Sequence, residues 1–177
     1  MQVFVLSNDF QENAESYFDT HVNKIATEIA QIICTTARAK IEYQFDCVDP
    51  SIYRMAHINH PWVKWCMESW YNFNWLASLH EALTDEYGYR YRKIHATIRV
   101  VDKIYEIFED KIIPNIDIND RFDEPNIYPL CMPDRFKSID AVAAYRAYYI
   151  GEKMHLCKYT NRSIPGWMQD AYDRKKS

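Results

Sequence analysis

Glycine is scarce in this chain, and its scarcity limits the folds that the chain can adopt. Only three glycines occur among 177 residues, at Gly88, Gly151 and Gly166. The tight turns of β-hairpins usually need glycine, so a hairpin-rich all-β fold is disfavoured. Three scattered glycines also exclude the clustered glycine loops that cradle phosphates in nucleotide-binding motifs.

Apolar residues recur at helical spacing through most of the chain. The first long predicted helix runs from Ala14 to Lys40, and a break near Asp19 would divide it. Its apolar positions fill an arc of roughly 120° on a helical wheel, which predicts a stripe facing the core. The members of this stripe are Val22, Ile25, Ala26, Ile29, Ile32 and Ile33.

Other segments complete a mainly helical pattern. Gln2 to Ser7 is rich in β-branched and aromatic residues and predicts one short buried strand or extended segment. Asn8 and Asp9 then offer side chains that can cap a helix, and Pro61 and Ser138 are expected to begin two others. Further helices are predicted at about 61–73, 74–93 (continuous with the preceding one or separate), 95–110 and 139–159.

The region 110–137 has a different character. It holds four prolines among Asp and Asn residues, so we expect an irregular loop packed over the helices. The end of the chain, 168–177, is charged and is expected to fray. The predicted fold is a mainly α, single compact helical domain over 1–177, with a short N-terminal strand and this proline-rich loop.

Charge and cysteine content limit which partners and which cellular compartment we expect. The net charge is −4, so nucleic acid would have to bind at a local basic patch on an acidic body. The five cysteines are odd in number and lack CxxC spacing, which favours reduced thiols in a cytosol. We see no signal peptide at the start, and no apolar run approaches the ~20 residues that span a membrane.

The strongest candidate for chemistry is a polar stripe on the first long helix. His21, Lys24 and Glu28, followed by Gln31 and Thr35, fall within about 80° of one another on a helical wheel. The stripe borders the apolar arc, where burial would raise a Glu pKa and lower a Lys pKa, as acid–base or imine chemistry needs. The alternative is an ordinary Lys24–Glu28 ion pair beside a core.

A second polar stripe follows the motif Asn59-His60-Pro61. His60, Lys64 and Glu68 share one helix face, which could contact a ligand or simply face solvent. A metal site through His57, His60 and His21 would lack any recognised ligand spacing. We therefore assign no metal and no cofactor.

Basic and aromatic residues concentrate between Glu86 and His95. Arginines bind phosphate in bidentate fashion and tyrosines offer stacking faces for bases. The alternative is a helix C-terminus whose cations complement the helix dipole. With residues from the second polar stripe and the last helix, the candidates for nucleotide or nucleic-acid binding are Asn59, His60, Lys64, Trp75, Tyr87, Arg90, Arg92, His95 and Arg146.

Taken together, these motifs resemble a widespread family of small uncharacterised bacteriophage proteins. The resemblance covers roughly nine-tenths of the chain and implies a phage origin and a host-cytoplasmic setting, with no established activity. The matching residues are Val3-Phe4-Val5-Leu6, His21-Val22, Lys24, Glu28, Gln31, Asn59-His60-Pro61, Glu68, Trp75, Glu86-Tyr87, Arg90-Tyr91, Met132-Pro133-Asp134, Tyr145-Arg146, Glu152-Lys153, Pro165 and Trp167.

A smaller part of the chain is similar to pyrimidine-dimer DNA glycosylases. The similarity rests on Asn59-His60-Pro61, the aromatic helix after it, and Glu86 with Arg90-Tyr91. The similarity implies an amine that forms an imine with the substrate. In those enzymes this amine belongs to residue 2, after Met1 has been removed. Here residue 2 is Gln2, whose size should prevent that removal, so our hypothesis is that Lys24 supplies the amine beside Glu28.

Two functions from different classes follow. The first is an enzyme on nucleic acid or nucleotides, such as a glycosylase or lyase, with His21, Lys24 and Glu28 as reacting groups. Aromatic walls from Trp65, Trp75 and Tyr87 would hold a flipped base. The second is a phage protein that binds a nucleotide signal or a host protein without turnover. A purely structural role for both stripes is a third interpretation.

Overall fold

The computed structural model describes residues 2–45, 50–111 and 127–176, and side chains are described for most of these. Within this part the chain forms seven α-helices and no strand. The predicted mainly α fold is confirmed. The helices are α1 Phe10–Glu15, α2 Asp19–Phe45, α3 Pro61–Glu68, α4 Trp70–Tyr91, α5 Ile98–Lys111, α6 Ala141–Tyr148 and α7 Gln169–Lys176.

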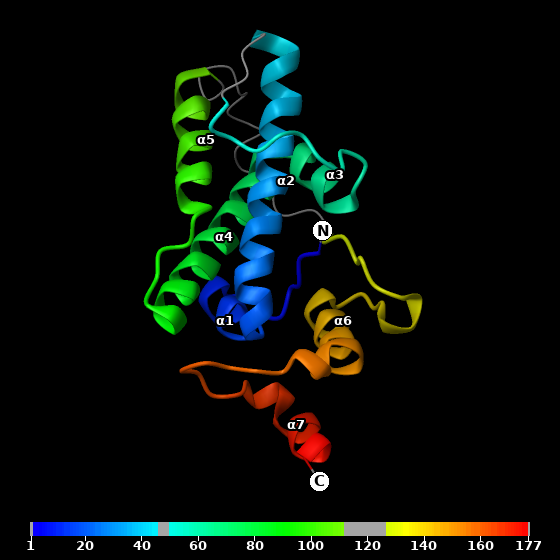
Figure 1. Cartoon of the computed structure of the whole chain (residues 1–177). Helices are drawn as coiled ribbons and strands as arrows, with labels where there is room; N and C mark the ends of the chain where they lie inside the picture. The colour runs from blue at the N-terminus through cyan, green and yellow to red at the C-terminus, as the bar shows by residue number, and fades with distance from the viewer. Residues whose placement is uncertain (1, 46–49, 112–126, 177) are drawn as a thin grey trace.

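Helix α2 is the centre of the fold (Figure 1). It packs against α3, α4 and α5, and α1 packs against α4. Every member of its predicted apolar stripe is at most 1% exposed, so that stripe does face the core. The break expected near Asp19 lies between the end of α1 at Glu15 and the start of α2.

Local chemistry explains where the helices begin. The carboxylate of Asp9 accepts the N–H of Glu12 and caps α1, as predicted. Pro61 occupies the first turn of α3, and Nδ1 of His60 accepts the N–H of Trp62 at 3.2 Å. Ser69 has extended backbone and separates α3 from α4, so the two predicted helices are not continuous.

The predicted N-terminal strand is wrong in one respect. Val3 to Leu6 is extended and buried, yet it has no β-partner in the described part of the chain. Side chains satisfy its backbone instead. The hydroxyl of Tyr17 accepts the N–H of Phe4 at 2.9 Å and donates to its carbonyl at 2.6 Å, and Oδ1 of Asn13 accepts the N–H of Leu6 at 2.8 Å.

The last predicted helix is shorter and less regular than expected. Asp140, not Ser138, caps α6, which ends at Tyr148. The chain continues as a π-helical segment, Tyr149–Lys153, and a 3₁₀ turn, Met154–Leu156. Gly151 allows the π segment to lie against Phe136, because a Cβ at position 151 would stand 2.8 Å from that ring.

The two remaining irregular regions have different outcomes. Of the predicted loop 110–137, residues 112–126 lie outside the described residues, and α5 extends to Lys111. Residues 127–133 have no regular structure and pack over α3 and α4 through Tyr128, whose ring centroid lies 4.9 Å from that of Trp75. The sequence predicts that the tail 168–177 frays, but its residues Gln169–Lys176 form α7 after a 3₁₀ turn, Gly166–Met168, and residue 177 lies outside the described residues.

The cysteines agree with a reduced protein. None of Cys34, Cys66, Cys131 and Cys157 forms a disulfide among the described residues, and Cys47 lies outside them. Burial raises the pKa of the Cys34 thiol to about 11 and that of the Cys66 thiol to about 12. Buried protonated thiols of this kind are inert core residues.

Candidate functional site

Glu28 is the carboxylate around which the candidate site forms. Its Oε1 lies 3.5 Å from Nζ of Lys24, one helical turn away on α2. Its Oε2 accepts the backbone N–H of Gln2 at 2.7 Å. The Glu28 side chain is 14% exposed and that of Lys24 is 65% exposed. A mostly buried carboxylate therefore faces an accessible amine.

The buried N-terminal segment brings Gln2 to this carboxylate. Tyr17 holds Phe4 through two hydrogen bonds, and the guanidinium of Arg146 donates to the carbonyl of Leu6 at 2.7 Å. Burial raises the pKa of Tyr17 well above its ordinary value, so its hydroxyl stays protonated and can donate. These contacts fix the segment beside α2, and the Gln2 N–H points at Glu28.

His21, predicted as a third reacting group, lies beneath the surface. It is 6% exposed, and its ring is stacked against Phe4 and Phe18. Its Nδ1 lies 2.7 Å from the hydroxyl of Tyr149. Burial, with the positive charges of Lys153, Lys24 and His155, lowers the pKa of His21 to about 4. At neutral pH the ring is therefore uncharged.

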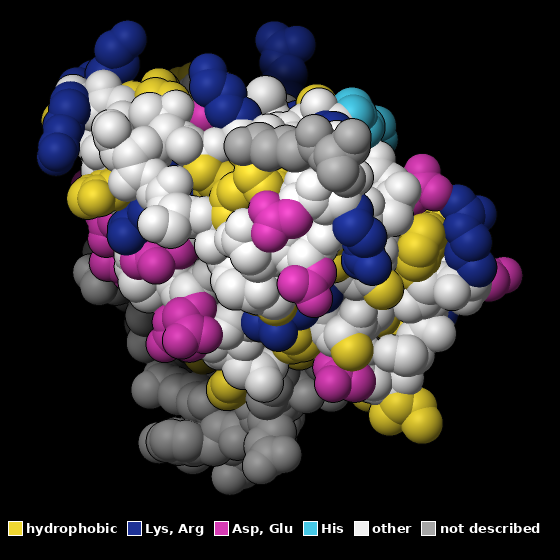
Figure 2. Space-filling view, turned by 90° about the horizontal axis from the view of Figure 1, so that it is seen from below, with side chains coloured by type: hydrophobic (Ala, Val, Ile, Leu, Met, Phe, Trp, Pro, Cys, Tyr) yellow, Lys and Arg dark blue, Asp and Glu magenta, His cyan; other side chains and the backbone are white. Residues whose placement is uncertain are grey.

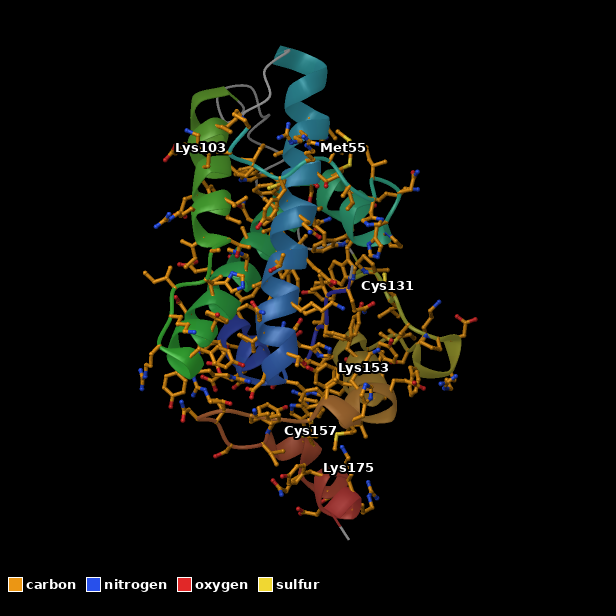
Figure 3. The ribbon with its side chains drawn as sticks, viewed as in Figure 1. Met55, Lys103, Cys131, Lys153, Cys157 and Lys175 are labelled. Atoms are coloured by element: carbon orange, nitrogen blue, oxygen red, sulfur yellow. The ribbon has the colours of Figure 1, made fainter. Side chains whose placement is uncertain are left out.

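Cations from distant parts of the chain gather near the start of α2. Lys153 and His155 follow α6, yet both act on the charge of His21. Nζ of Lys153 lies 5.0 Å from the ring centroid of Tyr148, which packs against Phe4. Figure 3 shows Lys153 beside the lower half of α2, with Lys103 far from it on α5. No local pattern in the sequence brings position 153 to position 21.

Arg90 has a different environment from the one expected for a phosphate ligand. Its side chain is 0% exposed. Nε donates to Glu86 at 2.6 Å, and Nη1 donates to Asp19 at 3.0 Å and to the carbonyl of Tyr17 at 2.9 Å. Nη2 donates to the carbonyl of Glu15 at 3.0 Å. Four of its five N–H donors are thus occupied inside the protein, which leaves little for a phosphate.

The C-terminal segment closes over the same ion-pair network. Asp19 accepts the N–H and the hydroxyl of Thr160, and Arg162 donates to Glu86 at 2.8 Å. Burial alone would raise the pKa of Asp19, but hydrogen bonds from Thr160 and Arg90 bring it below its usual value. In Figure 1 this segment crosses beneath α1, α2 and α4. Arg90 and its partners therefore join the ends of the chain.

Three other predicted binding residues are also held by the fold. Trp75 is 6% exposed and packs in a cluster with Trp62 and Trp65. His95 is 5% exposed, with Nε2 2.9 Å from Oδ1 of Asn23, and Tyr87 packs edge-on against its ring at 4.8 Å. A base could stack on Trp75 only after local rearrangement.

The remaining predicted residues lie nearer to solvent. Asn59 and Lys64 are exposed at the start of α3, and His60 is half-buried there as its N-cap. The side chain of Arg92 is exposed. Its backbone has φ 55°, in the left-handed region, and it caps the C-terminal end of α4. Arg146 is half-buried, with its guanidinium 5.0 Å from the ring centroid of Trp167.

The structure groups the predicted residues only in part. His21, Lys24 and Glu28 lie along one helix, as their spacing requires. An enzyme of the predicted kind would have these three, His60 and Arg90 around a single pocket. The cavity between α4 and α5 and the one beneath the C-terminal segment are lined by none of these five residues. A shared pocket therefore has no support, and the candidate site is the smaller group around Glu28.

Comparisons with known proteins identify no relative of this chain. No family model matches the chain, and no curated protein and no solved structure matches it. The site must therefore be judged on its own geometry.

Two broader surface features bear on partners. None of the described helices is long and apolar enough to cross a membrane. On the face seen from below, acidic and basic side chains are interspersed (Figure 2). A nucleic acid would therefore not find an extended basic surface on this face, in keeping with the net charge of −4.

Proposed function

We propose that this chain is a phage protein that acts on nucleic acid or nucleotides as a DNA glycosylase or lyase does, in the cytoplasm of an infected host. The observation that carries the proposal is the Glu28 carboxylate, 14% exposed, between the Lys24 amine at 3.5 Å and the Gln2 N–H at 2.7 Å. The reacting roles go to Lys24 and Glu28. His21, buried and neutral, has the supporting role of packing α2 against Phe4.

The chemistry follows from an accessible amine beside a shielded carboxylate. Glu28 accepts a proton from the Lys24 ammonium, and the free amine attacks C1′ of a damaged nucleotide; at an abasic site the amine condenses with the C1′ aldehyde instead and water leaves. The bond from C1′ to the base breaks, and the base leaves with the electron pair and a proton from Glu28 or water. The sugar ring then opens to an imine between C1′ and Nζ.

Cations near Lys24 suit a phosphate backbone. Lys153 and His155 lie close enough to act on the charge of His21, one turn before Lys24. Lysine side chains neutralise phosphates as point charges, so the two lysines at this end of α2, Lys24 and Lys153, favour an anionic substrate. This patch is local, as the acidic composition of the chain requires.

Borohydride trapping tests the proposal directly. Wild-type protein is mixed with borohydride and with a duplex that contains an abasic site or a pyrimidine dimer. A covalent complex between protein and DNA should form. Lys24→Ala should reduce its yield by about tenfold or more, because the imine nitrogen is lost. The matched control is Lys103→Ala, which also removes an ion-paired helical lysine. No complex with wild type, or an equal yield from Lys24→Ala, would contradict the proposal.

A second candidate is binding without turnover, and the exposure of Lys24 favours it. A side chain that is 65% exposed can reach a phosphate at the protein surface and form an ion pair with it, without any reaction at its nitrogen. The same cations would then hold a nucleotide or an acidic partner for sequestration.

Recovery of the ligand separates the two candidates. The protein is incubated with a panel of nucleotides and short DNA duplexes, then denatured, and the released molecules are identified by mass spectrometry. Glycosylase or lyase action predicts a free base or a cleaved strand. Intact ligand, retained by wild type and lost in Lys24→Ala, would establish sequestration in its place.

A further inference from the structure

A cavity between α4 and α5 forms a second candidate site. Its volume is about 330 Å³, and its lining includes Ala77, His80 and Glu81 from α4 and Val101 and Tyr105 from α5. It lies on helices other than the one that carries Lys24 and Glu28. A ligand bound in this cavity would therefore be independent of the proposed function.

The walls of the cavity carry negative charge. Glu81, Asp85 and Asp102 line it, and all three side chains are exposed. None of them forms an ion pair with another residue in the part of the chain that the structure describes. Burial and the charge of Glu81 raise the pKa of Tyr105 to about 12. The cavity thus combines three unpaired carboxylates with one aromatic ring.

A buried histidine adds an acceptor of a different kind. His80 lines the cavity and is 3% exposed. Its Nε2 lies 2.7 Å from Oγ1 of Thr97, and that oxygen lies 2.7 Å from Nδ1 of His95. Nε2 of His95 in turn lies 2.9 Å from Oδ1 of Asn23. The four side chains form one continuous hydrogen-bonded series.

This series fixes which nitrogen of each ring carries the proton. Oδ1 of Asn23 can only accept, so Nε2 of His95 donates and Nδ1 of His95 accepts from the Thr97 hydroxyl. The Thr97 oxygen is then free to accept from Nε2 of His80. Nδ1 of His80 is left with a lone pair and has no hydrogen-bond partner among the described residues. His80, which lines the cavity, therefore has one ring nitrogen that can still accept a hydrogen bond.

These groups select the chemical class of the ligand. Carboxylates and a lone-pair nitrogen all accept hydrogen bonds, so the ligand must donate them, and the charge requires a cation. Among the described residues, no group of three His, Cys, Asp or Glu side chains could hold a metal ion. Val101, Ala77 and the Tyr105 ring supply apolar surface for methylene groups. Nucleic acid would be repelled by the three carboxylates.

We propose that the cavity between α4 and α5 binds a small aliphatic polyamine. Its ammonium groups pair with Glu81, Asp85 and Asp102, and one N–H donates to Nδ1 of His80. Glu81 and Asp85 are one turn apart and so about 6 Å apart along the helix axis. Such a spacing suits a chain with two ammonium groups.

Calorimetric titration of the full chain with 1,4-diaminobutane and spermidine tests this proposal. Wild type should show saturable binding, and butylamine, which has one ammonium group, should bind about tenfold more weakly or worse. Glu81→Gln and Asp102→Asn should each weaken diamine binding several-fold. Glu106→Gln removes the same charge from α5 outside the cavity, and it should leave the affinity unchanged.

Two results would overturn the assignment. One is the absence of saturable binding to wild type by either polyamine. The other is an equal loss of affinity in Glu106→Gln and Asp102→Asn, which would mean attraction by net charge alone. His80→Gln should weaken diamine binding several-fold, because it removes the buried acceptor. Asp85→Asn on the exposed rim removes one of the three charges and should also weaken binding several-fold, so the proposal stays testable if His80→Gln does not fold.

Discussion

At the scale of single residues, burial decides what each charged side chain does. The sequence predicts that Lys24 and Arg90 both act on a ligand, and both have a carboxylate one helical turn away. Lys24 is 65% exposed and remains accessible to a substrate. Arg90 is fully buried, and its donors are occupied by Asp19, Glu86 and two carbonyls. Spacing along a helix predicts neighbours but does not predict depth.

Removal of the Arg90 charge should destabilise the protein strongly. Arg90→Met would leave Glu86 and Asp19 with buried charge and fewer partners, at a cost of about 3–5 kcal/mol. Urea unfolding followed by circular dichroism measures this loss. Arg99→Met on the exposed side of α5 is the control, and its free energy of unfolding should change by about 0.5 kcal/mol or less. Similar values for both variants would contradict a structural role for Arg90.

Buried histidines should make the protein sensitive to mild acid. Burial lowers the pKa of His21 and that of His80 to about 4, whereas the unfolded chain binds these protons near pH 6.5. Because the unfolded state binds more protons between these values, stability is full above pH 6.5 and falls as the pH drops toward 4. Each histidine should cost about 2 kcal/mol between pH 7 and pH 5.

Urea unfolding at pH 7 and pH 5 checks this expectation. His21→Phe keeps an aromatic ring between Phe4 and Phe18 but cannot be protonated, so it should remove about 2 kcal/mol of the pH dependence and leave the part due to His80 and His95, whose pKa burial also lowers. The carboxylate of Asp19 has a lowered pKa and loses its contribution only below about pH 4, outside this window. An equal stability at both pH values would show that the histidines are not held neutral by the fold.

At the scale of elements, an extended segment without a partner strand organises the candidate site. The β-branched and aromatic residues of Val3 to Leu6 predict a buried segment, and its burial is confirmed. Its hydrogen-bond partners are side chains of Asn13, Tyr17 and Arg146. A sequence pattern of strand type indicates buried extended backbone, but it cannot show whether a second strand exists.

Tyr17→Phe should therefore weaken the whole N-terminal segment. The substitution leaves both polar backbone groups of Phe4 buried without a partner, at about 1–3 kcal/mol for each group. Chemical denaturation should show a loss of about 2–6 kcal/mol, and Tyr89→Phe, at an exposed tyrosine, should show almost none. If both substitutions are neutral, the hydroxyl of Tyr17 does not hold the segment.

The π-helical segment makes a separate prediction through its glycine. In Gly151→Ala the new Cβ would stand 2.8 Å from the Phe136 ring, which must move away. We expect a loss of about 1–3 kcal/mol in the free energy of unfolding. A Cβ at position 166 would meet no atom within 4 Å, so Gly166→Ala is the matched control and should be neutral or slightly stabilising. A neutral Gly151→Ala would mean that Phe136 is not fixed against the segment.

At the scale of the whole molecule, the sequence predicts the helices better than it predicts how they meet. The periodicity of α2 identifies its core face, and Asp9 and Pro61 mark two helix starts. The contact of Arg90 with Asp19 lies beyond such reasoning, because Asp19 is 71 positions away and the contact exists only once α2 and α4 have packed. The same is true of Gln2 and Glu28, 26 positions apart, and of Lys153 near His21.

Lys24 as the reacting amine is central to the proposed function. The most direct measurement is peptide mapping, by mass spectrometry, of the borohydride-reduced complex with an abasic duplex. We predict that the adduct is found on the peptide that contains Lys24, and that Glu28→Gln lowers its yield without moving it. An adduct on any other amine, or no adduct at all, would contradict the assignment of Lys24.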